Sequence, residues 1–129
     1  LNGGMLFIDY GFLKQKNKNT LQSVKNHKQN MIFSNLGNAD ITSLVDFNLL
    51  KYYLKKKKLI VNNIVSQKFF LEKMGIISRA ERMSKKMSFR EKSDLYLRLQ
   101  RLLGSSQMGE LFKVISAFKM NKKFSLGFI

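Results

Sequence analysis

Hydrophobic residues form three short runs, separated by longer polar or amphipathic segments. The first run, Met5–Ile8, follows a glycine pair and ends at Asp9, Tyr10 and Gly11. Four consecutive large apolar residues favour a strand that is buried on both faces, as in parallel sheets. Ligands of open α/β sheets bind at the carboxyl ends of strands, so Asp9 and Tyr10 are candidate functional residues. The alternative is that Asp9 only caps the turn that follows.

The two later runs predict strands at residues 59–65 and 110–118. Between the first two strands, apolar side chains at helical spacing predict a helix that Asn38 or Asp40 caps and that runs to about Lys57. A strand–helix–strand crossover of this kind makes the two strands parallel within one sheet. The third run is apolar on both faces, which predicts an interior strand.

Shorter helices are predicted in the second half of the chain. Residues 66–74 form one, ended by Gly75. The Ser-x-x-Glu capping-box pattern occurs at Ser78 and again at Ser88. The second box opens a helix with four leucines on one face, and Gly104 ends it. That leucine spacing is typical of core packing.

Charge separates two interpretations of the chain. Its 129 residues contain 24 Lys and Arg against 8 Asp and Glu, a net charge of +16. Such a balance indicates binding to nucleic acid or another anionic surface. The alternative is a drift toward AT-rich codons, because Lys, Asn, Ile and Phe are abundant whereas Pro, Cys and Trp are absent. The run Lys55–Lys58 also suits a helix C-terminus, where the macrodipole favours cations, and a phosphate-binding patch is its alternative.

Few residues are available for chemistry. Without cysteine there is no disulfide or thiolate metal site, and the single histidine, His27, argues against a histidine metal cluster. The candidate site therefore consists of Asp9 and Tyr10 with Asp40, Asp46 and His27. The predicted helix starts at the sheet edge that holds Asp9, and the long polar segment with His27 is anchored there as a lid. Each residue also has a structural interpretation: a cap for Asp40, a lysine pair for Asp46 and loop hydrogen bonds for His27.

Five ordered blocks point to a known family, and together they span nearly the whole chain. They are Gly3-Gly4-x-x-x-Ile8-Asp9-Tyr10-Gly11, Thr20-Leu21-Gln22-x-Val24-x-x-His27, Ala39-Asp40-Ile41-Thr42-x-x-Val45-Asp46-Phe47, Gln67-x-x-Phe70-Leu71-x-x-Met74-Gly75-Ile76-x-x-Arg79 and Met108-Gly109-x-Leu111-Phe112-Lys113-Val114. In this order they resemble the C-terminal half of the MidA family of S-adenosylmethionine-dependent methyltransferases, which includes the mitochondrial complex I assembly methyltransferase.

The resemblance implies an α/β fold, the C-terminal half of a class I methyltransferase (Rossmann-like) sheet with strand order 3-2-1-4-5-7-6. The three strands would be the fifth, sixth and seventh, with flanking helices and with the antiparallel seventh between the other two. Residues 1–129 would form the C-terminal part of a single domain. The implied activity is methylation of an arginine in a protein substrate, such as a complex I subunit, in the bacterial cytoplasm or the mitochondrial matrix.

The sequence also departs from the family pattern. The glycine-rich turn and the acidic residue that hold the cofactor in such folds belong to earlier strands. S-adenosyl-L-methionine is therefore expected to bind mainly to an N-terminal half that this chain lacks. Leu36-Gly37 replaces the Pro-Gly of the family, and Asn62-Asn63-Ile64 stands where a Gly-Pro pair is usual. Two other functions stay open: a basic nucleic-acid-binding module and a non-catalytic partner domain.

Overall fold

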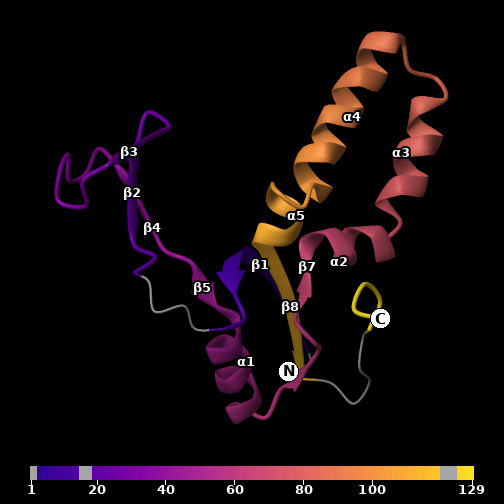
Figure 1. Cartoon of the computed structure of the whole chain (residues 1–129). Helices are drawn as coiled ribbons and strands as arrows, with labels where there is room; N and C mark the ends of the chain where they lie inside the picture. The colour runs from indigo at the N-terminus through magenta and orange to yellow at the C-terminus, as the bar shows by residue number, and fades with distance from the viewer. Residues whose placement is uncertain (1–2, 15–18, 120–124) are drawn as a thin grey trace.

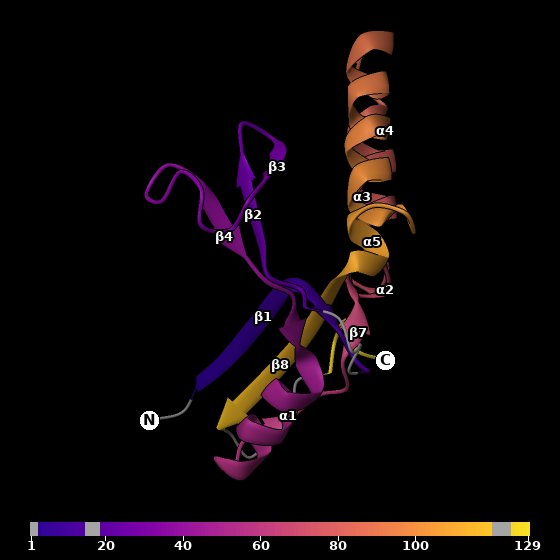
Figure 2. The same cartoon turned by 60° about the vertical axis from the view of Figure 1, so that its left-hand side comes forward.

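The computed structural model describes residues 3–14, 19–119 and 125–129. In these residues the chain forms a five-stranded main sheet, a separate three-stranded sheet and five helices. Figures 1 and 2 show the small sheet and a pair of helices, α3 (Ile76–Ser84) and α4 (Phe89–Leu103), projecting beyond the same end of the main sheet. Among the described residues, no helix is both long and apolar enough to cross a bilayer.

The centre of the main sheet is β8 (Phe112–Lys119). It pairs antiparallel with β1 (Gly3–Phe12) over eight residue pairs, from Gly3 opposite Lys119 to Tyr10 opposite Phe112. On its other side it pairs antiparallel with β6 (Ile60–Val61) and β7 (Val65–Ser66). The prediction of an interior last strand between two parallel neighbours is therefore confirmed. The order β1-β8-β6 agrees with the order fifth, seventh, sixth that the resemblance implies.

One helix covers each face of β8. On one face, Phe47 and Leu54 of α1 (Phe47–Lys56) pack against Ile115 and Ala117. On the other face, Phe70 of α2 (Gln67–Lys73) packs with Val114 and with Phe128 from the C-terminal segment. Phe47, Val114 and Ile115 are fully buried. Alternation along a strand sends successive side chains to opposite faces, so a strand with two covered faces must be apolar throughout.

Burial of β1 on both faces was predicted, and this is wrong. Met5, Leu6 and Ile8 are 44%, 51% and 42% exposed. The helices cover β8 rather than β1. Among the described residues, the only strand that pairs with the other side of β1 is β5 (Val45–Asp46), and it pairs only at Gly11 and Phe12.

The helix predicted from Asn38 or Asp40 begins later, at Phe47, and Asp46 caps it. Asp40 instead starts β4 (Asp40–Thr42), which pairs with β2 (Gln22–Lys25) in the small sheet. The third strand of that sheet is β3 (Lys28–Asn30). Pairing with a strand distant in sequence has overridden the local helical spacing.

Three other boundaries also differ from prediction. The strand expected at residues 59–65 is split into β6 and β7, because Asn62 between them turns its buried amide to donate to Ser116 Oγ at 2.9 Å. The last strand starts at Phe112, since the preceding residues form the short helix α5 (Met108–Leu111). Ser78 lies inside α3 (Ile76–Ser84) and does not cap it.

Helices α3 and α4 form an antiparallel hairpin (Figure 1). Leu95 and Leu99 of α4 line a shallow groove together with Ile77 and Ala80 of α3. These leucines therefore pack between the helices and not in the core of the main sheet. Gly75 precedes α3 with a φ of 80° and Gly104 ends α4, so both predicted helix ends are confirmed.

The capping box at the start of α4 makes the helix sensitive to acid. The Ser88 hydroxyl and the Ser88 backbone N–H both donate hydrogen bonds to the Glu91 carboxylate. These bonds, the hydroxyl's being the larger cause, lower the pKa of that carboxyl. A group with a lowered folded-state pKa stabilises the fold above its unfolded pKa, and the contribution is lost as pH falls through the folded value. We expect faster amide exchange in the first turn of α4 upon acidification below the usual glutamate range. Glu91→Gln, which keeps the box but does not titrate, should abolish this pH dependence.

Candidate functional site

The carboxyl end of β1 meets the start of α1. Gly11 pairs with Val45 and Phe12 with Asp46 in a short parallel bridge, and α1 follows directly. A Cβ on Gly11 would lie against the Phe47 ring and 2.5 Å from the Val45 carbonyl oxygen. Only glycine therefore allows β1, β5 and α1 to approach this closely. The expectation that the helix starts at the edge holding the end of β1 is confirmed, with Asp46 in the place expected for Asp40.

Asp46 has a defined structural role. Its Oδ1 accepts hydrogen bonds from the backbone N–H groups of Asn48 and Leu49, each at 3.0 Å. An aspartate at this position satisfies donors that have no partner within the helix, and its charge suits the positive end of the macrodipole. The structure thus gives Asp46 a capping role, in place of the expected pairing with a lysine one turn away.

Tyr10 lines a cavity of about 360 Å³ at the end of β1. Its ring contacts the Phe112 ring, with the ring centroids 4.0 Å apart and the ring planes tilted by 41°. The cavity has a mixed lining from β1, the small sheet and α5: Tyr10, Thr20, Gln22, Thr42, Ser43, Leu44 and Leu111. The Thr20 hydroxyl also accepts a hydrogen bond from the backbone N–H of Leu44 at 3.3 Å, which holds the two connecting segments together. Aromatic, hydroxyl and amide groups here can bind a planar polar side chain.

Asp9 belongs to the opposite face of β1. Successive side chains of a strand alternate between faces, so Asp9 shares its face with Phe7 and Gly11, on the side of α1. Its register partner is Lys113, whose ammonium donates to the Glu110 carbonyl. Asp9 Oδ1 accepts from the Tyr10 backbone N–H at 2.8 Å, and the side chain is otherwise exposed. Asp9 and Tyr10 are thus adjacent in the chain but reach different surfaces.

His27 and Asp40 lie in the small sheet. His27 is exposed in the tight turn between β2 and β3, where Asn26 and His27 have φ of 50° and 60°. Asp40 is exposed and pairs with Val24. Figures 1 and 2 show this sheet projecting away from the main sheet. The segment expected as a lid is thus a small sheet in its described part, and residues 15–18 of it lie outside the described residues.

Apart from Tyr10, the residues that line this cavity were not predicted from the sequence. Thr20, Thr42, Ser43 and Leu111 come from segments that are far apart in the chain. Threonine and leucine carry no chemical signal of their own. Thr20, Thr42 and Leu111 do lie within the sequence blocks that carry the family resemblance. Their presence in those blocks was the one signal that could have indicated a role in the site.

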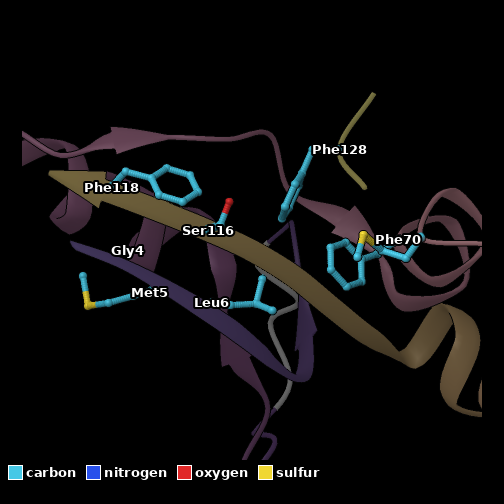
Figure 3. Close-up of a pocket in the computed structure, with 8 residues that line it drawn as sticks. Gly4, Met5, Leu6, Phe70, Ser116, Phe118 and Phe128 are labelled. Carbon is cyan, nitrogen blue, oxygen red and sulfur yellow. The ribbon is translucent and has the colours of Figure 1, made fainter. Parts of the chain in front are cut away.

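A second cavity, of about 310 Å³, lies on the face of the sheet that α2 covers (Figure 3). It is lined by Gly4, Met5, Leu6, Phe70, Met74, Ser116, Phe118 and Phe128. The Ser116 hydroxyl is its single side-chain polar group, and no titratable side chain is among these residues. The described residues also contain no cluster of three or more His, Asp or Glu side chains that could hold a metal ion. The cavity at Tyr10 is therefore the better candidate for a polar substrate.

Comparison with known families identifies the class of protein. Residues 1–65 of the 129 match the model of the family described as "Putative S-adenosyl-L-methionine-dependent methyltransferase". The chain therefore belongs to this family of S-adenosyl-L-methionine-dependent methyltransferases. This confirms the resemblance that the five sequence blocks indicated.

The named relatives are longer proteins. The chain is 31% identical over 124 residues to the mitochondrial protein arginine methyltransferase NDUFAF7 homologue of Caenorhabditis elegans, covering 96% of this chain. It is 30% identical over 126 residues to mitochondrial protein arginine methyltransferase NDUFAF7 of Xenopus tropicalis, covering 93% of this chain. The chain spans only 29% and 28% of the lengths of these two relatives.

Two solved structures from Burkholderia thailandensis share the fold. An uncharacterised protein superimposes on 98% of this chain with a TM-score of 0.88 at 27% identity, over 35% of its own length. The other, described as a "likely methyl transferase" and bound to S-adenosyl-homocysteine, superimposes on 97% of this chain with a TM-score of 0.82 at 27% identity, over 34% of its own length. The predicted α/β fold of a methyltransferase sheet is thus confirmed.

Proposed function

We propose that this chain is the C-terminal part of a methyltransferase domain that transfers the methyl group of S-adenosyl-L-methionine to an arginine of a protein substrate. The carrying observation is the superposition of nearly the whole chain on a methyltransferase-like protein bound to S-adenosyl-homocysteine. The arginine is supported by the names of the relatives, which are protein arginine methyltransferases. The incomplete partnering of β1 supports the assignment to one part of a larger domain.

The residues described here fit the substrate better than the cofactor. The cavity at Tyr10 is lined by hydroxyl, amide and apolar groups and includes no carboxylate for the ribose hydroxyls. Gly11 is followed by Phe12 rather than by a glycine-rich turn. We therefore assign the cofactor to residues beyond this chain, and the role of this chain is to hold and orient the acceptor side chain.

Methyl transfer to nitrogen is an in-line displacement, so positioning the acceptor is the main task of the protein. The Tyr10 ring lines the cavity and offers an aromatic face on which a planar guanidinium can stack. Asp9 lies on the opposite face of the same strand end, so its carboxylate is proposed as an alternative anchor that orients the guanidinium by charge-assisted hydrogen bonds on the side of α1. His27 and Asp40 are proposed as outer contacts of the protein substrate, and Asp46 supports the site by fixing the start of α1.

The proposed substrate protein and compartment follow from the family resemblance. A complex I subunit is the proposed bearer of the arginine. The proposed compartment is the mitochondrial matrix in a eukaryote, in line with the mitochondrial relatives, or the cytoplasm in a bacterium.

The test compares this chain with a longer protein that carries it behind a cofactor-binding half. By calorimetry, residues 1–129 alone should not bind S-adenosyl-L-methionine, whereas the longer protein should bind it and transfer its methyl group to arginine in a protein substrate. Specific micromolar binding by residues 1–129 would refute the assignment of the cofactor to other residues. Cofactor binding without arginine methylation of any protein substrate would count against the proposed activity.

A further inference from the structure

The far end of the α3–α4 hairpin combines positive charge with exposed apolar side chains. We define the hairpin tip as residues 82–90, which comprise the end of α3, the connection and the start of α4. Four of these nine residues are basic and none is acidic, and all four basic side chains are exposed: Arg82, Lys85, Lys86 and Arg90. Met83 is 59% exposed and Phe89 is 90% exposed. Figures 1 and 2 show that this end of the hairpin lies farthest from the main sheet.

Local helix stability does not account for this composition. Ser88 and Glu91 already complete the capping box at the start of α4. Arg90 lies in the first turn of α4, where the macrodipole disfavours a cation. Phe89 is the first residue of the same helix and leaves nearly its whole ring in solvent, which carries a hydrophobic cost. The run Lys55–Lys58 differs in this respect, because it closes α1 at the end that favours cations.

We propose that the hairpin tip docks on the surface of an anionic phospholipid membrane. In this arrangement Phe89 and Met83 enter the interface between headgroups and acyl chains, and the four basic side chains bind the lipid phosphates. Apolar residues surrounded by Lys and Arg are the composition that peripheral membrane contacts use. A convex tip suits a flat, deformable surface, whereas single-stranded nucleic acids and peptides are usually held in grooves of the protein. The inference is independent of the proposed methyl transfer.

Flotation with vesicles tests the role of charge. The whole chain should float with vesicles of phosphatidylcholine and phosphatidylserine but not with phosphatidylcholine alone. Lys85→Glu with Lys86→Glu should weaken binding by about thirtyfold or more, because each basic residue near an anionic surface contributes about fivefold. The matched control is Lys55→Glu with Lys56→Glu, which removes the same charge elsewhere and should have a much smaller effect. An equal loss in both double variants would mean that net charge alone binds the vesicles, and the proposal would fail.

A fluorescent reporter tests insertion of the apolar side chains. The chain contains no tryptophan, so Phe89→Trp provides a single tryptophan, at the tip, whose emission is separable from that of the tyrosines by the choice of excitation wavelength. Its emission should shift to the blue when phosphatidylserine vesicles are added, and Phe89→Ser should reduce flotation by about tenfold. Leu97→Trp is the control, because Leu97 is also exposed, at 58%, but lies along α4. An unshifted Phe89→Trp emission would overturn the proposal, as would binding of an acidic protein or a nucleic acid at the tip with no binding to vesicles.

Discussion

Residues 1–129 alone are expected to self-associate as their concentration rises, through the open edge of β1. From Gly3 to Tyr10 this strand pairs with β8 on one side. On the other side its pairing with described residues is limited to Gly11 and Phe12. An extended edge with unpaired backbone groups recruits other strands, and exposed apolar side chains favour this further. Sedimentation velocity across a concentration series should show the shift to larger species.

Charge at half-exposed apolar positions of β1 should suppress this association. Leu6 and Ile8 are both about half exposed and lie on the same face, so Leu6→Lys with Ile8→Lys places like charges where two copies would meet. We expect the dissociation constant to rise by about tenfold or more, the equivalent of 1.4 kcal/mol. Leu97→Lys, at an exposed position on α4, should leave association unchanged. A monomeric wild-type chain at every concentration would contradict the prediction.

The sequence predicted those elements whose signals are local. The capping box of Ser88 and Glu91 and the glycine after α2 each depend on a few adjacent residues, and both are found in the structure. The central position of β8 followed from a run that is apolar on both faces, since no edge or one-sided strand needs that pattern. The strand order followed from the family resemblance, and the structure confirms it.

Elements that depend on distant partners were mispredicted. The three-residue spacing of Ile41, Leu44 and Phe47 is compatible with a helix, but Ile41 pairs with Ser23 in the small sheet and the helix starts only at Phe47. The same dependence on distant segments limited the prediction of the site. The segments that line the cavity at Tyr10 meet only because the small sheet and α5 both return to the end of β1, and no local pattern encodes that return.

In a longer protein that has both halves of the domain, Asp9→Asn is expected to lower the rate of arginine methylation by ten- to a hundredfold. The substitution keeps the size of the side chain and removes its charge. Asn can still accept the hydrogen bond that Asp9 Oδ1 receives from the Tyr10 N–H, so the strand end should keep its conformation. A carboxylate hydrogen-bonded to a guanidinium contributes roughly 1.5–3 kcal/mol, which corresponds to about one to two decades in rate.

Two measurements on the same variant separate substrate orientation from a role in folding or cofactor binding. Methyl transfer to the protein substrate should fall, while affinity for S-adenosyl-L-methionine should stay close to that of the wild type, because we assign the cofactor to residues outside this chain. Asp94→Asn makes the same chemical change at an exposed position of α4 and should alter neither quantity. Wild-type turnover in Asp9→Asn, or a loss of cofactor affinity that matches the loss of rate, would leave Asp9 with its local hydrogen bond to Tyr10 as its only role.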